Sequence, residues 1–188
     1  MANTLTATRL LLVLPFAYLM ARGGADHAAL GALILLAAIA TDLLDGRVAR
    51  RRGTATRAGG AFDHAADFLF VSSGLAAGAS RGAFPWILPI LVALAFAQYA
   101  ADSYWLHRDR GLRTSRLGRY NGILYFAPLG GDILVRLGLP WLQPAVTAVA
   151  WVLVASTVLS MAERLHAVTA SGRARGSPAG EREDRPPR

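Results

Sequence analysis

The chain has 188 residues, of which 54% are hydrophobic and only 17% are charged. This composition argues against an ordinary soluble domain and is typical of an integral membrane protein. The absence of cysteine excludes disulfide bonds and thiolate metal sites, so any metal must be bound by oxygen ligands or by histidine.

The basic residues are distributed unevenly along the chain. The formal net charge is +8 and all twenty basic residues are arginines, which concentrate in alternate gaps between apolar segments, at residues 47–57 and 108–119, and after residue 163. This alternation follows the positive-inside rule for multispanning proteins and argues against nucleic-acid binding. We therefore attribute the basic excess to membrane topology and to attraction by anionic lipids.

Six apolar segments follow one another along the chain. They cover Leu5–Met20, Ala28–Ala49, Ala58–Ala79, Phe84–Leu106, Tyr120–Gly138 and Pro144–Ala162. A spanning helix needs about 20 residues, so the sequence predicts an all-α, polytopic membrane protein with six transmembrane helices and both termini cytoplasmic. Residues 1–168 form the predicted transmembrane domain. Residues 169–188, rich in Ser, Gly, Pro and charge, are a predicted disordered cytoplasmic tail.

Four carboxylates lie within the second and third apolar segments: Asp42, Asp45, Asp63 and Asp67. An ionised carboxylate at bilayer depth is tolerated when it faces the protein interior and is paired. Spacings of three and four residues place each pair on one helix face, and a cytoplasmic hairpin at residues 50–58 would bring the two pairs together. The carboxylates indicate a functional site, and an ion-pair network with neighbouring arginines is the alternative.

The chemistry of these four side chains points to a hard metal ion. Oxygen donors without a thiolate favour Mg²⁺ or Mn²⁺, and four anionic groups can hold two such ions. Divalent metals commonly act together with phosphate groups. Gly46, Ala49 and Gly59 keep the nearby helix surfaces small, so that a ligand can approach the backbone.

Residues 42–67 match the pattern D-x-x-D-G-x-x-A-R-x8-G-x-x-x-D-x-x-x-D at every defined position. In this pattern the chain resembles the CDP-alcohol phosphatidyltransferases. The opening Asn3-x-x-Thr6-x-x-Arg9 is also similar to the start of many family members, where the first span begins near the active site. Capping of the first helix by Asn3 is an alternative explanation for that residue.

The resemblance implies a membrane enzyme of phospholipid biosynthesis that transfers a phosphatidyl group from CDP-diacylglycerol to an alcohol and releases CMP. It implies two Mg²⁺ or Mn²⁺ ions bound by the four aspartates, with Asp67 also acting as the catalytic general base. The residues implied for CDP binding are Asp42, Asp45, Gly46, Ala49, Arg50 and Gly59. The expected location is the inner membrane of a prokaryote, with the active site at the cytoplasmic face and homodimerisation as in other members.

The second arginine-rich gap offers a candidate acceptor site. Arginine binds phosphate with two hydrogen bonds, so Arg113, Arg116 and Arg119 favour a polyol phosphate acceptor such as glycerol 3-phosphate or inositol phosphate. Arginines that only set the topology are an equal alternative, and an acceptor without phosphate, such as serine, stays open. From another functional class, a small ion or proton transporter would also place acids in the membrane.

Two further features have structural explanations that do not involve ligands. His64 follows Asp63 directly, and we interpret it as a packed interfacial histidine rather than as a metal ligand. The aromatic residues Tyr99, Tyr120 and Tyr125, with Tyr104 and Trp105, suit the aromatic belt at a membrane interface.

Overall fold

The computed structural model describes the backbone of residues 2–52, 57–105 and 116–175, which are helical apart from short connections. The side chains of residues 2–6, 44–52, 57–59, 61, 102–105, 116, 117, 119 and 167–175 lie outside this description. The elements are α1 (Ala2–Ala21), α2 (Ala25–Arg52), α3 (Arg57–Ser80), α4 (Ile87–Trp105), α5 (Arg116–Leu124), α6 (Phe126–Arg136), the short 3-10 helix η1 (Pro140–Leu142) and α7 (Gln143–Arg175).

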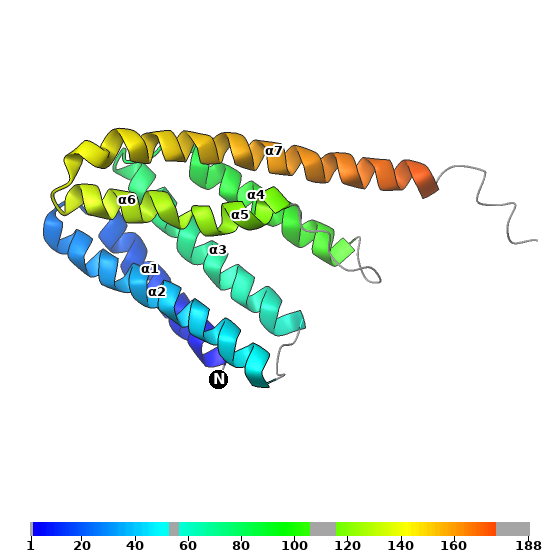
Figure 1. Ribbon diagram of the computed structural model, residues 1–188, viewed down its shortest axis with the longest axis horizontal. Coiled ribbons are helices and arrows are strands. Elements are labelled where there is room, and N and C mark those ends of the chain that lie inside the picture. Colours follow the sequence, from blue (N-terminus) through cyan, green and yellow to red (C-terminus); the bar gives the residue numbers. More distant parts are fainter. Residues whose placement is uncertain (1, 53–56, 106–115, 176–188) are drawn as a thin grey trace, which may run out of the picture.

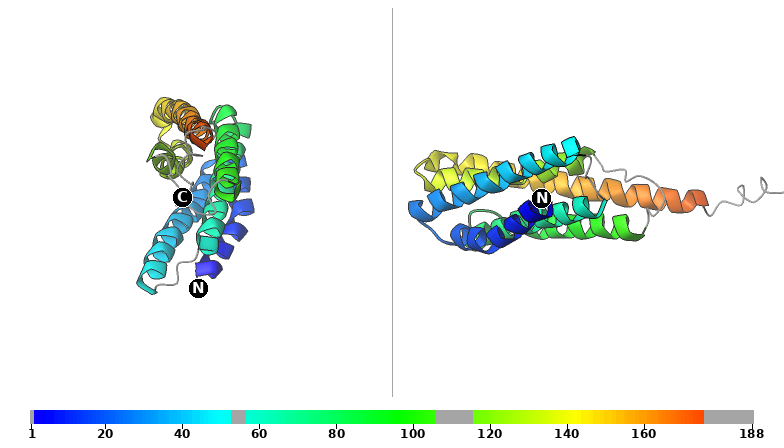
Figure 2. Two further views of the ribbon diagram at one scale, coloured as in Figure 1. Left: turned by 90° about the vertical axis from the view of Figure 1, so that its right-hand side faces the viewer. Right: turned by 90° about the horizontal axis from the view of Figure 1, so that it is seen from below.

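The helices form two groups, α1 to α3 and α4 to α7, which meet where α3 contacts α4 and α6 and where α2 contacts α6. Helix α1 packs most extensively on α3 and also contacts α2, whereas α7 contacts α4, α5 and α6 (Figure 1). Seen end-on, α7 and the α5–α6 pair lie on one side of the row formed by α1, α3 and α4 (Figure 2). Helix α1 therefore lies between the two helices that carry the predicted site.

The predicted fifth segment, residues 120–138, is divided in the structure. Helices α5 and α6 are separated by the single residue Tyr125, whose backbone N–H still donates to the carbonyl of Asn121 at 2.9 Å. Pro128 in the first turn of α6 has no N–H to donate to the carbonyl four residues earlier. This missing hydrogen bond explains why the helix is interrupted here.

The core is built from apolar side chains of α1, α3, α4, α6 and α7. The rings of Phe16 and Phe70 stack with centroids 4.4 Å apart and an angle of 12° between their planes. Gly74 lies against the same ring, because a Cβ atom at that position would be 2.6 Å from Phe16 and 3.2 Å from Leu129. Glycine at this position thus lets α1 and α6 approach α3 closely.

Many large apolar side chains remain on the outside of the bundle. The most exposed include Leu11, Leu14, Leu33, Val152 and Trp141. Among the described residues, two segments are long and apolar enough to cross a membrane, Ala25–Leu43 and Pro140–His166, and the helices Ala7–Ala21 and Ile87–Ala101 are shorter. The structure is therefore all-helical and consistent with a membrane protein, and the six-span topology stays a prediction.

The end of the chain differs from the expected boundary. Helix α7 continues to Arg175, so residues 169–175 are helical where the sequence predicts the beginning of a disordered tail. The rest of that predicted tail, residues 176–188, lies outside the described residues.

Candidate metal centre

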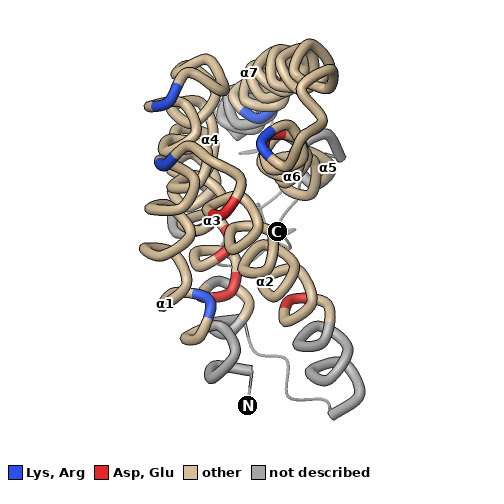
Figure 3. The backbone as a smooth tube through the Cα atoms, turned by 90° about the vertical axis from the view of Figure 1, so that its left-hand side faces the viewer, with Lys and Arg blue, Asp and Glu red and all other residues tan. Residues whose placement is uncertain are grey.

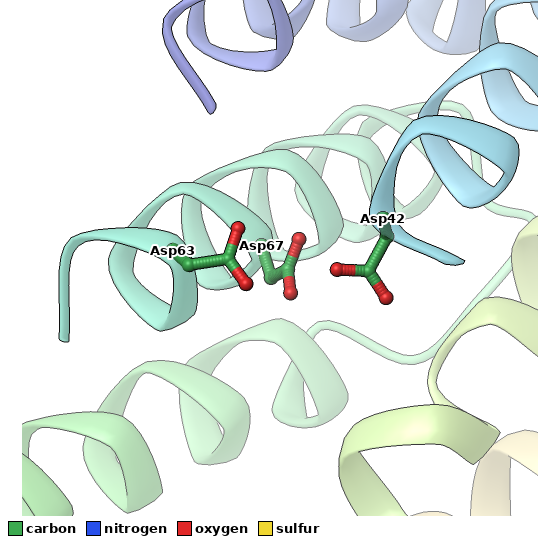
Figure 4. Close-up of side chains that lie close together, drawn as sticks. All are labelled: Asp42, Asp63 and Asp67. Carbon is green, nitrogen blue, oxygen red and sulfur yellow. The ribbon is translucent and has the colours of Figure 1, made fainter. Parts of the chain in front are cut away.

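Three of the four predicted metal ligands come together. Asp42 near the end of α2 and Asp63 and Asp67 near the start of α3 point toward one another (Figure 4). One carboxylate oxygen from each lies within 4.8 Å of the other two. The two α3 residues are one helical turn apart, which places both on one face of α3. Asp45 follows on α2, with its side chain outside the described set.

A buried arginine from α1 reaches into this group. The guanidinium of Arg9 donates to Asp63 Oδ1 at 3.1 Å, to Asp42 Oδ1 at 3.3 Å and to Asp67 Oδ1. Its side chain is only 1% exposed, while the three carboxylates retain between 29 and 46%. The cluster is therefore closed by Arg9 on its inner side and accessible on the other.

The donor set suits a divalent metal better than it suits a closed ion-pair network. Three carboxylates and one guanidinium carry a net charge of −2, from three negative charges and one positive charge. Oxygen ligands of one Mg²⁺ lie roughly 3 to 4 Å apart, given bonds of about 2.1 Å, and a separation within 4.8 Å is close to this arrangement. Thus these carboxylates can hold a hard cation after a small movement.

For most of the other predicted site residues the structure describes the backbone but not the side chain. Gly46, Ala49 and Arg50 lie with Asp45 in the last two turns of α2, and Gly59 lies in the first turn of α3. Of the predicted acceptor residues, Arg116 and Arg119 lie in α5 with undescribed side chains, and Arg113 lies outside the described residues. The structure therefore places the backbone of the CDP segment beside the carboxylates, and the roles of these residues stay predictions.

His64 packs against an aromatic ring. Its imidazole meets Tyr99 of α4 edge to face at 6.0 Å between centroids. The guanidinium of Arg164 on α7 lies over the same tyrosine, 5.3 Å from the ring centroid. The side chain of His64 is nevertheless exposed, so its role stays a prediction.

Tyr125 does not belong to an interfacial aromatic belt, contrary to the expectation from sequence. Its side chain is buried between α5 and α7, and its hydroxyl forms a 2.7 Å hydrogen bond with Thr157 Oγ1. One turn earlier, Asn121 Oδ1 accepts a 2.7 Å hydrogen bond from Ser156. A buried tyrosine needs such a partner, so this residue joins two helices.

A second ionic cluster lies at the other end of α3. Asp132 on α6 is 1% exposed and is 2.5 Å from Arg81 and 3.7 Å from Arg136. Both arginines also donate to backbone carbonyls at the end of α1, Arg81 to Met20 at 3.2 Å and Arg136 to Leu19 at 3.1 Å. Figure 3 shows a basic position of α1 near acidic positions, and an acidic and a basic position together on α6. This second cluster fastens α1, α3 and α6 together.

The ion pairs of Arg9 were not predicted from the sequence. The signal for them is its place as the third residue of the Asn3, Thr6, Arg9 series, whose spacing of three puts all of them on one helix face. An arginine inside an apolar segment needs an anionic partner for the same reason that the aspartates need a cation. Together, these two facts indicate the pairing.

Comparisons with known proteins agree with the motif. The family described as CDP-alcohol phosphatidyltransferase matches residues 1–162. Proteins named "Probable phosphatidylglycerophosphate synthase" from two strains of Mycobacterium tuberculosis are 35% identical over 95 residues, which is 49% of this chain and 46% of each relative. The chain thus spans about half the length of the curated relatives it matches, and no solved structure matches it significantly. With a family match over most of its length, the chain belongs to the CDP-alcohol phosphatidyltransferases, a family of membrane-integral phosphotransferases.

Proposed function

We propose that this protein transfers the phosphatidyl group of CDP-diacylglycerol to a polyol phosphate and releases CMP, as a step of phospholipid biosynthesis. The observation that carries the proposal is the convergence of Asp42, Asp63 and Asp67 in a chain that matches the family over residues 1–162. Among acceptors, glycerol 3-phosphate is favoured because the matched relatives are named for phosphatidylglycerophosphate.

The chemistry is a displacement at phosphorus. The acceptor hydroxyl oxygen attacks the donor phosphorus that carries diacylglycerol, the bond from that phosphorus to the CMP oxygen breaks, and CMP leaves. Asp67 takes the proton of the attacking hydroxyl. Two bound Mg²⁺ or Mn²⁺ ions would supply charge compensation to the diphosphate.

The chain's own residues would bind and orient the substrates. Asp42, Asp45, Asp63 and Asp67 would hold the metal ions, and Gly46, Ala49, Arg50 and Gly59 would surround the nucleotide and diphosphate. The convergence of Asp42 with Asp63 and Asp67 supports this proposal. Arg113, Arg116 and Arg119 would bind the acceptor phosphate through charge-assisted hydrogen bonds.

The proposed setting is a bacterial inner membrane. Six spans, counting α5 and α6 as one, would place both termini and the metal centre at the cytoplasmic face, where arginine-rich segments are favoured. The outward-facing leucines and tryptophans support contact with lipid. Homodimerisation is part of the proposal through the family resemblance.

The test is CMP release by the purified chain with CDP-diacylglycerol and Mg²⁺ or Mn²⁺. Glycerol 3-phosphate, inositol 1-phosphate, inositol and serine are compared as acceptors, with and without EDTA. We expect metal-dependent release with glycerol 3-phosphate, and a loss of about 10³-fold in Asp67→Asn, the range for a general base. The exposed Asp26 on the first turn of α2 offers a control, Asp26→Asn, that should keep full activity.

Each result decides a different part of the proposal. CMP release with serine or inositol alone would show that the acceptor is an unphosphorylated alcohol and not a polyol phosphate. Full activity of Asp67→Asn would remove that residue as the base. Absence of metal-dependent CMP release with every acceptor would overturn the proposed function.

A further inference from the structure

Arg9 occupies the place where the family chemistry requires a metal. Its guanidinium contacts an oxygen of each of Asp42, Asp63 and Asp67, and it comes from a third helix, α1. The side chain is almost fully buried, and its Nε is buried without a hydrogen-bond partner among the described residues. The carboxylates are therefore the partners that hold this arginine in position.

The arginines at the other end of α3 show what a purely structural role looks like. Arg81 and Arg136 each combine contact with Asp132 with donation to backbone carbonyls at the end of α1. These contacts join α1, α3 and α6. The hydrogen bonds of Arg9 go instead to the carboxylates that could hold a metal ion.

We propose that Arg9 is a positioning residue of the metal centre: it holds the three carboxylates together in the metal-free protein and competes with the divalent cation for them. The guanidinium and a metal ion bound by the same carboxylates would be only a few ångströms apart, and their positive charges would repel each other strongly at that distance. A guanidinium does not lose its proton in proteins. Metal binding therefore has to move Arg9 away from one or more of its carboxylate partners.

This inference rests on the proposed function in one respect, that the carboxylates bind a divalent metal. It adds that metal affinity is set by an internal competitor as well as by the ligands. Removing the charge of Arg9 then strengthens metal binding, while the loss of an anchoring side chain weakens the metal-free fold. A residue with only a structural role would reduce stability without increasing metal affinity.

The experiment measures Mn²⁺ binding to the full chain in detergent after removal of metal with EDTA. The concentration of free Mn²⁺ is measured by electron paramagnetic resonance for wild type, Arg9→Gln, Arg9→Lys and Arg22→Gln. Arg22 is an exposed arginine at the far end of α1, next to Tyr18, and serves as the control. Thermal unfolding is recorded for each protein with EDTA and with Mn²⁺.

We expect Arg9→Gln to bind Mn²⁺ at least about tenfold more tightly than wild type, because a nearby positive charge is gone. Arg9→Lys keeps the charge but lacks the fork that spans several carboxylates, so its affinity should lie between the two. With EDTA, Arg9→Gln should unfold at a lower temperature than wild type, and Mn²⁺ should restore most of the difference. Arg22→Gln should match wild type in both measurements.

The outcomes separate this inference from the proposed function. Equal or weaker Mn²⁺ binding by Arg9→Gln, with binding by wild type, overturns the competition and leaves the metal centre in place. If Arg9→Gln cannot be purified, Arg9→Lys decides by the same criterion. If wild type itself binds no Mn²⁺, the competition and the metal-dependent function both fail.

Discussion

The two ionic clusters of the molecule use the same residue types in opposite proportions. Near the start of α3, three aspartates share one arginine, whereas near its end two arginines share Asp132. The second cluster also satisfies carbonyls of α1, and its acid is 1% exposed. The first keeps an excess of partly exposed negative charge. The comparison shows that a membrane protein can bury charge either to join helices or to prepare a site for cations.

The largest expected effect is a loss of activity when an aspartate of the first cluster is replaced. Asp42→Asn should lower metal-dependent CMP release by more than about 100-fold, which is the upper range for groups that only support metal ligands. Its melting temperature in EDTA should stay close to that of wild type. Three aspartates surround one arginine, so two carboxylates remain to balance the charge of that arginine after the substitution. Activity and unfolding of the same preparation test both statements, and a large loss of stability in EDTA would make the two clusters alike.

For Asp132→Asn we expect a loss of stability and no change in metal affinity. Removing this acid takes the counter-charge from Arg81 and Arg136, whose side chains are 24% and 6% exposed, and breaking a buried ion pair typically destabilises by roughly 3–5 kcal/mol. Unfolding in detergent measures the loss, with Asp26→Asn as the exposed control. Mn²⁺ affinity of the protein that remains folded should be unchanged; a shift in that affinity would show that the clusters are coupled.

The helix contact between the clusters can be tested at Gly74. This residue lies seven positions after Asp67, so both share one face of α3, and Arg81 follows directly after the end of that helix. Gly74→Ala should destabilise the fold by about 1–3 kcal/mol, the usual effect of overpacking, because its Cβ would lie 2.6 Å from Phe16. Gly122→Ala, on α5 with open space around it, is the matched control. Equal stability of the two variants would contradict the close approach of α1 and α3.

The smallest effect is expected away from both clusters. Tyr125→Phe removes the hydroxyl that bonds to Thr157 and should lower the free energy of unfolding by about 1 kcal/mol. The exposed Tyr120 provides the control Tyr120→Phe, which should be neutral. If both variants have the stability of wild type, the hydrogen bond between α5 and α7 contributes nothing measurable.

The sequence alone predicts the features of the fold and site that depend on local residue patterns. Four of the six predicted apolar segments, residues 5–20, 28–49, 58–79 and 144–162, lie wholly within helices, because long apolar runs have few other structures available in a membrane. The fourth segment begins three residues before α4, and the fifth is divided between α5 and α6. Asp63 and Asp67 share a face through their spacing of four, and Asp42 meets them as predicted. The predicted hairpin at residues 50–58 includes residues 53–56, which lie outside the described residues.

The remaining features depend on contacts between distant parts of the chain. Arg9 is 54 residues from Asp63, and Arg81 is 51 residues from Asp132. No periodicity relates such pairs, so the sequence indicated that each charge needs a partner without identifying it. The burial of Tyr125 was missed for a related reason, since it follows from the packing of α7 beside α5.

The position of Arg9 in the chain matters for biosynthesis. Residue 9 precedes residues 42, 63 and 67, and chains are synthesised from the N-terminus, so α1 reaches the membrane before the helices that carry the acids. The carboxylates therefore enter apolar surroundings when their counter-ion is already in place. Under the proposed function, assembly of the bundle does not have to wait for a metal ion, and metal loading would be a separate, later event in the life of the protein.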